Sequence, residues 1–269
     1  MRVFGLIGFP LTHSFSVKYF LEKFKREKIS GCSYQNFPIS SIELFQSIIK
    51  SNTGLEGLNV TIPYKGSVMA HLDRIEDTAK EIGAVNTIKI SRLKDQIILT
   101  GFNTDAYGFR ESLIPILERH KFRQKIAVIQ DKKTKIEYSH IKALILGTGG
   151  AAKSVAYELN QLNIDFVNVS RSPSGEKRIA YNTIDEEMMR THLLIINTSP
   201  LGMYPAVYEY PDIPYQYLTS DHILYDLIYN PEETEFLKKG KEKHVVVKNG
   251  YEMLTRQAEK SWEIWNSKS

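Results

Sequence analysis

Residues Lys142-Ala-Leu-Ile-Leu-Gly147-Thr-Gly149-Gly150-Ala151-Ala152-Lys153 place a short apolar run directly before a glycine turn and an alanine-rich segment. The run predicts a buried strand and the alanines predict the start of a helix. Gly147 permits a tight turn, Gly149 lets backbone N–H groups approach a phosphate, and Ala152 allows close packing of the helix on the strand. Small residues also serve ordinary tight turns. Because a helix amino terminus carries partial positive charge, this context favours a pyrophosphate site, with Gly147, Gly149, Gly150, Ala151 and Ala152 as cofactor-binding residues.

The next predicted strand indicates which dinucleotide is bound. Asp165-Phe-Val-Asn-Val-Ser170 ends about 20 residues after the first glycine, where NAD enzymes place an acidic residue for the ribose 2′-hydroxyl. Ser170, Arg171 and Ser172 stand there instead. A guanidinium beside two hydroxyls suits a 2′-phosphate, which a carboxylate would repel. We therefore expect NADP(H), contacted by these three residues; the alternative is a solvated arginine in a polar loop.

Size, charge and cysteine content exclude several classes of protein. The chain has 269 residues, 42% of them hydrophobic, and a formal charge of +4 with acidic and basic residues interspersed. This composition predicts a globular protein without a basic stripe for nucleic acid or membranes. The single cysteine, Cys32, excludes an internal disulfide and fits a reducing compartment. No apolar run approaches the ~18 residues of a membrane span, and the opening segment is too short for a signal peptide.

These features predict a cytoplasmic protein. They do not set its oligomeric state, and we expect a monomer or homodimer that binds a small-molecule substrate and no metal. The predicted elements indicate an α/β fold. Strand-like and helix-like segments alternate from Val3 to Gly101 without a phosphate loop of their own. A second αβ series begins at Ile141. The closing helix, Glu252 to Trp265, carries an apolar stripe that favours packing against the first series.

This order predicts two α/β lobes with a cleft between them. We expect a discontinuous substrate-binding domain of residues 1–103 and 238–269. Residues 104–237 then form a Rossmann-type NADP-binding domain. Residues 122–140 read as a hairpin-like insertion in that domain, since two short alternating runs flank a polar turn.

Several further clusters are unusual as pure scaffold. They are Gly8-Phe-Pro-Leu-Thr-His13-Ser14-Phe-Ser16, Gly57-Leu-Asn59-Val-Thr61-Ile-Pro63-Tyr-Lys65, Gly83-Ala-Val-Asn86-Thr87, Gly101-Phe-Asn103-Thr-Asp105 and Asn249-Gly250-Tyr-Glu-Met253-Leu-Thr-Arg-Gln257. To these are added Asn197-Thr-Ser-Pro-Leu-Gly202-Met203 and Asp226-Leu-Ile-Tyr229-Asn-Pro231. In this order, over nearly the whole chain, the sequence resembles the shikimate dehydrogenase family.

The resemblance implies that Lys65 and Asp105 form the catalytic pair. Reduction of a ketone by a nicotinamide needs a proton donor at the oxygen while hydride reaches the carbon. Lys65 follows the turn at Pro63, and Asp105 stands where a helix begins, from which it can orient Lys65 or share its proton. Taken alone, the two residues read as a solvated lysine and a helix cap.

The resemblance also implies the substrate and nicotinamide contacts. Ser14 and Ser16 match the carboxylate site, Thr61, Asn86 and Gln257 match contacts to ring hydroxyls, and Tyr229 matches a further substrate contact. Gly250 matches the position whose backbone meets the nicotinamide amide, and Met203 lies near that ring. The residues alone allow other roles: helix caps for the serines, partners of backbone groups at strand ends for Thr61 and Asn86, and local structure for His13.

The implied activity is the NADPH-dependent, reversible reduction of 3-dehydroshikimate to shikimate in chorismate and aromatic amino-acid biosynthesis. Two departures from the family pattern remove no functional group: Val17 replaces a proline, and Ser170-Arg171-Ser172 replaces Asn-Arg-Thr. Two alternatives stay open. One is an NAD-using quinate/shikimate dehydrogenase, against which Arg171 argues. The other is a non-catalytic NADPH-binding regulator, which has no need of both Lys65 and Asp105.

Overall fold

The chain folds into two compact α/β units. The computed structural model describes residues 1–11, 15–93, 96–119, 138 and 140–267. Unit 1 comprises Met1–Tyr107 and Gln257–Ser269, and unit 2 comprises Gly108–Arg256. Helices α4 (Thr104–Arg119) and α8 (Tyr251–Asn266) each contain a boundary between the units. The expected hairpin-like insertion at 122–140 lies almost entirely outside the described residues.

The unit boundaries differ from the expected domain boundaries at two places. Residues 104–107 belong to unit 1, and residues 238–256 belong to unit 2 rather than to the first domain. The second difference has a simple physical reason. Helix α7 (Glu235–Glu242) packs on strand β11 (Ile223–Asp226), and β12 (Val246–Lys248) pairs with β11, so backbone hydrogen bonds place this segment in the second sheet.

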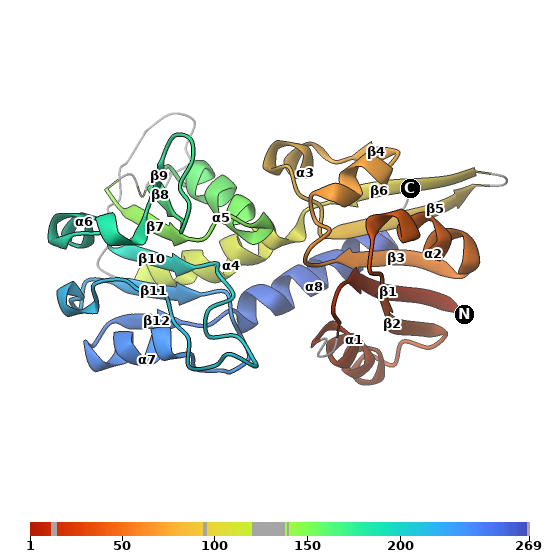
Figure 1. The fold of residues 1–269 in the computed structure, drawn as a ribbon. Coiled ribbons are helices and arrows are strands. Elements are labelled where there is room, and N and C mark those ends of the chain that lie inside the picture. Colours follow the sequence, from red (N-terminus) through yellow and green to blue (C-terminus); the bar gives the residue numbers. More distant parts are fainter. Residues whose placement is uncertain (12–14, 94–95, 120–137, 139, 268–269) are drawn as a thin grey trace, which may run out of the picture. The chain divides into compact units, whose positions relative to one another are not determined.

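Unit 1 is built on a mixed six-stranded sheet with the order β2-β1-β3-β5-β6-β4 (Figure 1). Its strands are β1 (Arg2–Gly8), β2 (Cys32–Pro38), β3 (Leu55–Val60), β4 (Arg74–Ile75), β5 (Thr87–Leu93) and β6 (Gln96–Phe102). Strand β1 is parallel to β2 and β3, whereas β5 is antiparallel to both of its neighbours. The remaining elements are α1 (Phe15–Arg26), η1 (Ile42–Leu44), α2 (Phe45–Ser51), η2 (Ser67–His71) and α3 (Asp77–Ile82).

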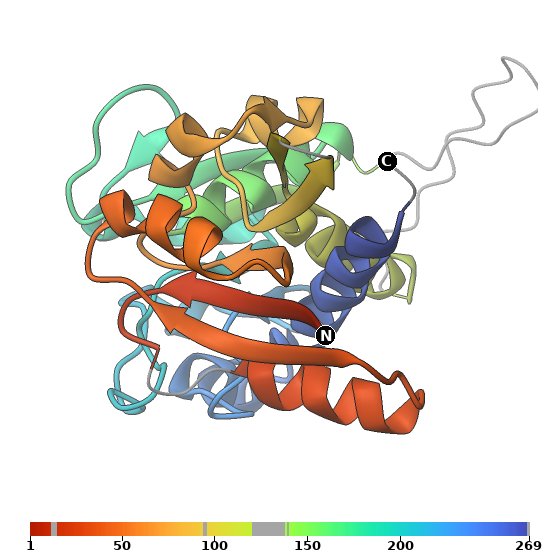
Figure 2. The same cartoon turned by 90° about the vertical axis from the view of Figure 1, so that its right-hand side faces the viewer.

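Successive side chains of β1 point to opposite faces of this sheet, so the core of unit 1 has two parts, one on each face. Phe4 and Leu6 pack with residues of α1 and α8, and Ile7 packs with residues of α2 and η2 on the other face. Figure 2 shows β1 and β2 side by side, with α1 beside them. Trp265 stacks on Phe4 at 5.0 Å between ring centroids, which confirms the expected packing of the closing helix on this unit. A Cβ on Gly57 would lie 2.4 Å from the Trp265 indole, so this glycine makes room for the ring.

Unit 2 has a parallel six-stranded sheet with the order β12-β11-β10-β7-β8-β9 (Figure 1). Its other strands are β7 (Lys142–Leu146), β8 (Asp165–Val169), β9 (Arg178–Ile179) and β10 (Leu194–Asn197). This is the doubly wound order of a Rossmann domain, in which the chain changes direction between β7 and β10. Its further helical segments are α5 (Gly150–Gln161), η3 (Tyr181–Thr183), α6 (Glu186–Thr191) and η4 (Tyr215–Tyr217). The predicted fold class is therefore confirmed.

Helices cover both faces of the second sheet, as apolar strands buried on both sides require. Ala143 and Ile145 face a core formed with α4 and α5, and Leu144 and Leu146 face a core formed with α6 and α7. Met253 of α8 belongs to the first of these cores, so the apolar stripe of the closing helix serves both units. Among the described residues, no helix is long and apolar enough to cross a membrane.

Candidate active site

In unit 1, Lys65 and Asp105 form an ion pair. The Lys65 Nζ lies 2.6 Å from the Asp105 Oδ2, and the two side chains are 17% and 9% exposed. Lys65 follows a turn in which the Tyr64 N–H donates to the Thr61 carbonyl, and its own carbonyl accepts from the Val85 N–H at 2.7 Å. Both ends of this short segment are therefore fixed, and the ammonium group is held against one carboxylate oxygen.

Asp105 is free for this contact because another residue caps its helix. The Asn103 Oδ1 accepts from the Ala106 N–H at 3.1 Å, which satisfies one of the open amides at the start of α4. The second carboxylate oxygen of Asp105 accepts from the Asn86 Nδ2 at 2.8 Å. The alternative that Asp105 is only a helix cap does not describe these contacts.

Asn86 joins the pair to the Gln257 side chain. Its amide nitrogen lies 3.4 Å from the Gln257 Oε1, and its amide oxygen accepts from the Thr104 N–H at 2.7 Å. Asn86 is 3% exposed and Gln257 is 8% exposed. Four of the predicted site residues, each from a different sequence motif, are thus brought together within unit 1.

A buried hydrogen-bond network that sequence reasoning did not assign lies next to this cluster. The Ser261 Oγ lies 3.0 Å from the Asn59 Nδ2, 2.8 Å from the Thr87 Oγ1 and 3.2 Å from the Thr104 Oγ1. The Asn59 Oδ1 accepts from the Tyr34 hydroxyl at 2.8 Å. A signal for Ser261 was present, since it stands four residues after Gln257 on α8 and so shares its face.

The remaining predicted substrate residues of unit 1 lie at the start of α1 and after β3. Ser16 is half-buried in the first turn of α1, and Tyr34 of the network is buried, which raises the pKa of its hydroxyl. Thr61 follows β3, and its N–H donates to the Ile7 carbonyl at 2.9 Å. Ser14 and His13 lie outside the described residues.

In unit 2, the glycine turn has the backbone that a phosphate site needs. Gly147 adopts φ +127°, and a Cβ there would lie 2.6 Å from the Thr198 Oγ1. Any larger residue would therefore be strained and would clash. Gly149 caps α5 without a side-chain hydrogen bond, and no acidic side chain stands in the first turn of this described helix. Ala152 is buried against the sheet, which brings the helix close to the strand. The first backbone amides of a helix have no partner within the helix, so this start suits an anion.

The loop after β8 carries the predicted 2′-phosphate residues. The Ser170 N–H donates to the Ile179 carbonyl at 2.9 Å, which ties the start of the loop to the end of β9. The Ser172 N–H donates to the Ser170 Oγ at 3.3 Å. Arg171 is exposed between them. This loop therefore presents a guanidinium to solvent on a short anchored turn.

The predicted nicotinamide residues, Met203 and Gly250, and the predicted substrate contact Tyr229 lie in three segments at the carboxyl ends of β10, β12 and β11. Met203 is 45% exposed in the turn after β10, and Tyr229 is half-buried after β11 with its pKa raised by burial. The Gly250 N–H donates to the Ile228 carbonyl at 3.0 Å, and a Cβ on Gly250 would lie 2.0 Å from the Leu227 carbonyl oxygen. Only glycine allows the two segments to approach this closely.

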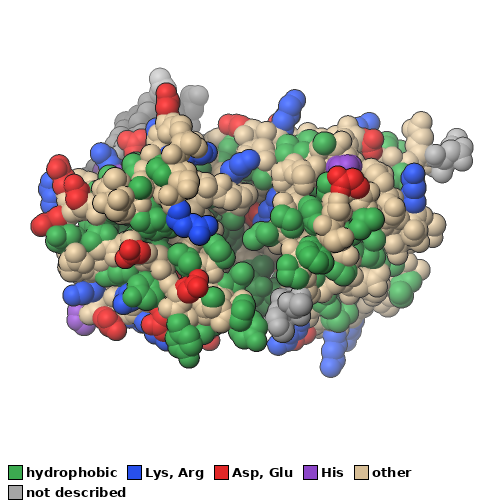
Figure 3. All heavy atoms as spheres, viewed as in Figure 1, with side chains coloured by type: hydrophobic (Ala, Val, Ile, Leu, Met, Phe, Trp, Pro, Cys, Tyr) green, Lys and Arg blue, Asp and Glu red, His purple; other side chains and the backbone are tan. Residues whose placement is uncertain are grey.

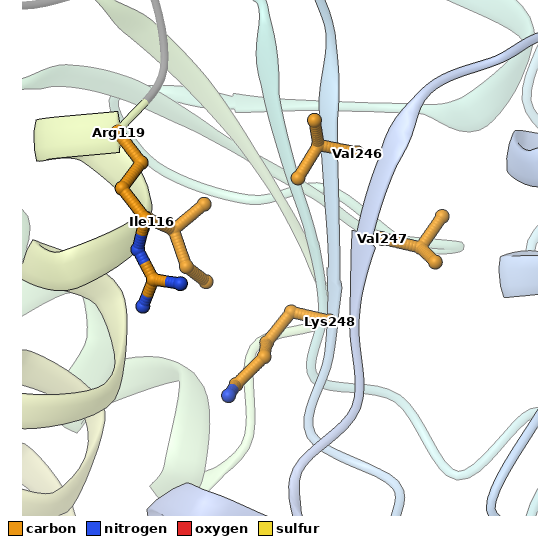
Figure 4. Close-up of a pocket in the computed structure, with 5 residues that line it drawn as sticks. All are labelled: Ile116, Arg119, Val246, Val247 and Lys248. Carbon is orange, nitrogen blue, oxygen red and sulfur yellow. The ribbon is translucent and has the colours of Figure 1, made fainter.

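A pocket of about 300 Å³ elsewhere in unit 2 is lined by none of the predicted residues. Figure 4 shows Ile116 and Arg119 of α4 opposite Val246 and Lys248 of β12, with Val247 pointing away. On the face drawn in Figure 3, acidic and basic side chains are intermixed, as their spacing in the sequence predicts. Among the residues described, no three His, Cys, Asp or Glu side chains gather as metal ligands.

Known proteins resemble the chain along nearly its whole length. The profile of the shikimate dehydrogenase substrate binding domain matches residues 6–88. The NADP(+) shikimate dehydrogenase of Clostridium beijerinckii is 40% identical over 98% of this chain and 92% of its own length.

Two solved structures show the same relationship. A chorismate mutase/shikimate 5-dehydrogenase fusion protein from Clostridium acetobutylicum is 35% identical, with a TM-score of 0.81 over 99% of this chain and 91% of that one. The Thermus thermophilus shikimate 5-dehydrogenase in complex with NADP(H) and shikimate is 26% identical, with a TM-score of 0.79 over 99% of this chain and 94% of that one.

Proposed function

The chain belongs to the shikimate dehydrogenase family, and on this premise we propose which of its residues bind and reduce the substrate. The protein is an NADP-dependent oxidoreductase that interconverts 3-dehydroshikimate and shikimate. The 2.6 Å contact between Lys65 and Asp105 is the observation on which our assignment depends, since it joins a proton donor to a charge partner in a partly buried site.

In the proposed mechanism, Lys65 is the acid/base group. Its ammonium donates a proton to the carbonyl oxygen of 3-dehydroshikimate as the carbonyl carbon is reduced, and in the reverse direction its amine accepts the proton of the shikimate hydroxyl. Asp105 holds the Nζ in place and stabilises its charge. Asn86 holds the other carboxylate oxygen, so Asp105 keeps one orientation toward Lys65.

The remaining unit 1 residues are proposed to hold the polar substrate. Ser14 and Ser16 bind its carboxylate, and Thr61, Asn86 and Gln257 pair with its hydroxyls, with Tyr229 of unit 2 as a further contact. The burial of Asn86 and Gln257 supports this assignment, because a buried hydroxyl left unpaired costs ~1–3 kcal/mol. Neutral donors and acceptors are the groups that a polyhydroxylated ring needs.

Bound NADPH supplies the hydride. The backbone of unit 2 fits this cofactor: Gly147 has a φ that favours glycine, α5 begins without an acidic group, and Arg171 is exposed beside two serines. We propose that Gly147, Gly149, Gly150, Ala151 and Ala152 hold the pyrophosphate and that Ser170, Arg171 and Ser172 hold the 2′-phosphate. Met203 and Gly250 then border the nicotinamide.

Unit 1 is proposed as the substrate domain and unit 2 as the cofactor domain. The match of the substrate-binding profile to residues 6–88 supports the first assignment. The single cysteine supports a cytoplasmic location, and we propose that the enzyme works there as a monomer or homodimer.

The test is the change in nicotinamide absorbance with shikimate or quinate, each with NADP and with NAD. We expect turnover chiefly with shikimate and NADP. Efficient turnover of quinate with NAD would favour the quinate/shikimate alternative instead. Binding of NADPH without turnover of either substrate would favour the regulator.

A further inference from the structure

Asp226 is a buried carboxylate outside the proposed catalytic cluster. It is the last residue of β11 and is 0% exposed. Its Oδ1 accepts from the Asn197 Nδ2 at 3.1 Å and from the Ile228 N–H at 3.0 Å, and its Oδ2 accepts from the Thr234 Oγ1 at 2.6 Å. Three separate segments of unit 2 thus converge on one side chain.

The Asn197 contact connects Asp226 to the turn that carries Met203. Asn197 ends β10 directly beside Asp226, as the strands pair there. The Asn197 Oδ1 accepts from the Ser199 Oγ at 2.6 Å, and the Asn197 Nδ2 also donates to the Leu201 carbonyl at 3.3 Å. Asp226 therefore fixes the side-chain amide of Asn197, which in turn holds the backbone of residues 199–201.

The Ile228 contact connects Asp226 to Tyr229 and Gly250. The Ile228 N–H donates to Asp226, and the Ile228 carbonyl accepts from the Gly250 N–H at 3.0 Å. Because Gly250 is packed on the Leu227 carbonyl, a shift of the Leu227–Ile228 backbone must move Gly250 or open a gap beside it.

The Thr234 contact closes the other end of the same loop. Thr234 is fully buried and caps α7, where its Oγ1 accepts from the Leu237 N–H at 3.4 Å. Asp226 thereby holds both Ile228, near the start of the loop, and Thr234, at its end. The Tyr204 N–H donates to the Asn230 carbonyl in this loop at 3.4 Å, which adds a link to the turn after Met203.

We propose that Asp226 is a positioning residue for the nicotinamide end of the cofactor site, because it joins the segments that carry Met203, Tyr229 and Gly250. This inference rests on the function proposed above. The α5 amino terminus and the Arg171 loop follow β7 and β8 and receive none of the three hydrogen bonds of Asp226 described above, so we expect the adenosine end of the cofactor to depend on it less.

Two variants separate the carboxylate's position from its charge. In Asp226→Asn, the amide oxygen still accepts from Asn197 and Ile228, and the amide nitrogen donates to the Thr234 Oγ1. In Asp226→Ala, all three contacts are lost. Asp185→Ala is the matched control, since the Asp185 carboxylate caps α6 in the same unit and accepts from the Met188 N–H at 2.8 Å.

The measurement compares the binding of two probes to the full chain: NADP, and adenosine 2′,5′-bisphosphate, which lacks the nicotinamide half. We expect Asp226→Ala to raise the Kd of NADP at least ~10-fold and to change the Kd of the bisphosphate less than ~2-fold. Asp226→Asn and Asp185→Ala should bind both probes within ~3-fold of the wild type.

If Asp226→Ala weakens the binding of both probes equally, or does not weaken the binding of NADP, the inference is overturned while the proposed function stays intact. If Asp226→Ala does not fold, Thr234→Val removes the contact to Oδ2 together with the side-chain cap of α7. It should weaken the binding of NADP selectively, whereas Asp185→Ala, which also removes a helix cap, should not. Selective loss supports positioning, and its absence contradicts it. A wild-type protein that does not bind NADP would remove the proposed function and this inference together.

Discussion

The Lys65 Nζ and the Asp105 Oδ2 lie 2.6 Å apart, although 40 residues separate them in the chain. The carboxylate is engaged on both oxygens, by the ammonium on one side and by the Asn86 amide on the other. This arrangement holds the Lys65 charge in one place, as an acid/base group requires.

Replacement of Lys65 by alanine should remove the proton donor but leave the neutral binding groups in place. We expect kcat to fall by ~10²–10⁴-fold and KM for shikimate to stay within several fold. Steady-state kinetics with NADP measures both constants. Lys80→Ala, at an exposed position on α3, is the control and should behave as wild type. Near-normal turnover by Lys65→Ala would remove Lys65 from the catalytic role.

Asp105→Asn should also lower kcat steeply, by at least ~100-fold. An asparagine has one acceptor oxygen, so it cannot accept from both Lys65 and Asn86, and its own N–H groups must face one of these donors. The control is Asp77→Asn in the exposed first turn of α3. An Asp105→Asn variant with wild-type kcat would show that Lys65 does not need its charge partner.

The buried network around Ser261 predicts a loss of stability. Ser261→Ala removes a hydroxyl that contacts Asn59, Thr87 and Thr104, so buried polar groups lose a partner. We expect the free energy of unfolding to fall by ~1–3 kcal/mol. Urea unfolding of this variant is compared with that of Ser47→Ala, at an exposed position on α2. Equal stability of the two variants would mean that the network adds nothing.

Arg171 should determine the choice of cofactor. A charge-assisted hydrogen bond to the 2′-phosphate is worth ~1.5–3 kcal/mol, so NADP should be preferred over NAD by at least ~10-fold in kcat/KM. Arg171→Ala should weaken the binding of NADP and leave the binding of NAD nearly unchanged. Arg190→Ala, at another exposed position, should change the binding of neither cofactor. Added salt should weaken the binding of NADP more than the binding of NAD, since the contact to the 2′-phosphate is ionic and near water. Equal efficiency of the wild type with both cofactors would contradict this role.

Asp226 should impose a pH dependence on stability. Burial raises the pKa of its carboxyl from 3.8 to about 7, so between these values the folded chain binds more protons than the unfolded chain. The contribution of Asp226 to the free energy of unfolding therefore falls as pH rises from about 4 to about 7, and is constant above that range.

Asp226→Asn removes this contribution, so its stability relative to wild type should increase with pH across the same window, by about 2–4 kcal/mol. Urea midpoints of the two proteins at several pH values measure the difference. The same substitution at exposed Asp212 is the control and should give no such trend. A difference that does not vary with pH would mean that Asp226 titrates alike in both states.

Local chemistry allowed the Rossmann turn to be predicted from sequence. The strand, the glycines and the alanine-rich helix start are adjacent in the chain, and the φ of +127° at Gly147 is a property of that short segment. The helices on both faces follow from the continuous apolar runs of β7 and β10 and from the right-handed connections of parallel strands. These constraints act over a few tens of residues.

The domain boundary expected at residue 238 did not rest on a local signal of this kind. Strand β12 has only three residues and one of them is Lys248, so its apolar pattern is weak. Its place in the second sheet is set by backbone hydrogen bonds to β11, which do not depend on side-chain type. Side-chain patterns carry little information about such pairing, which is why the expected boundary and the unit boundary differ here.

The sequence by itself determined the two αβ series, the phosphate turn and the residue types that reduction of a ketone needs. Only the tertiary structure decided which polar groups share a site. Asn59 is hydrogen-bonded to Ser261, 202 residues away in the chain. Asp226 accepts hydrogen bonds from Asn197, Ile228 and Thr234, which lie at two neighbouring strand ends and a helix cap. A buried polar group must find a partner, but which partner it finds depends on how the strands are ordered and where each strand ends, and these are properties of the packed sheet.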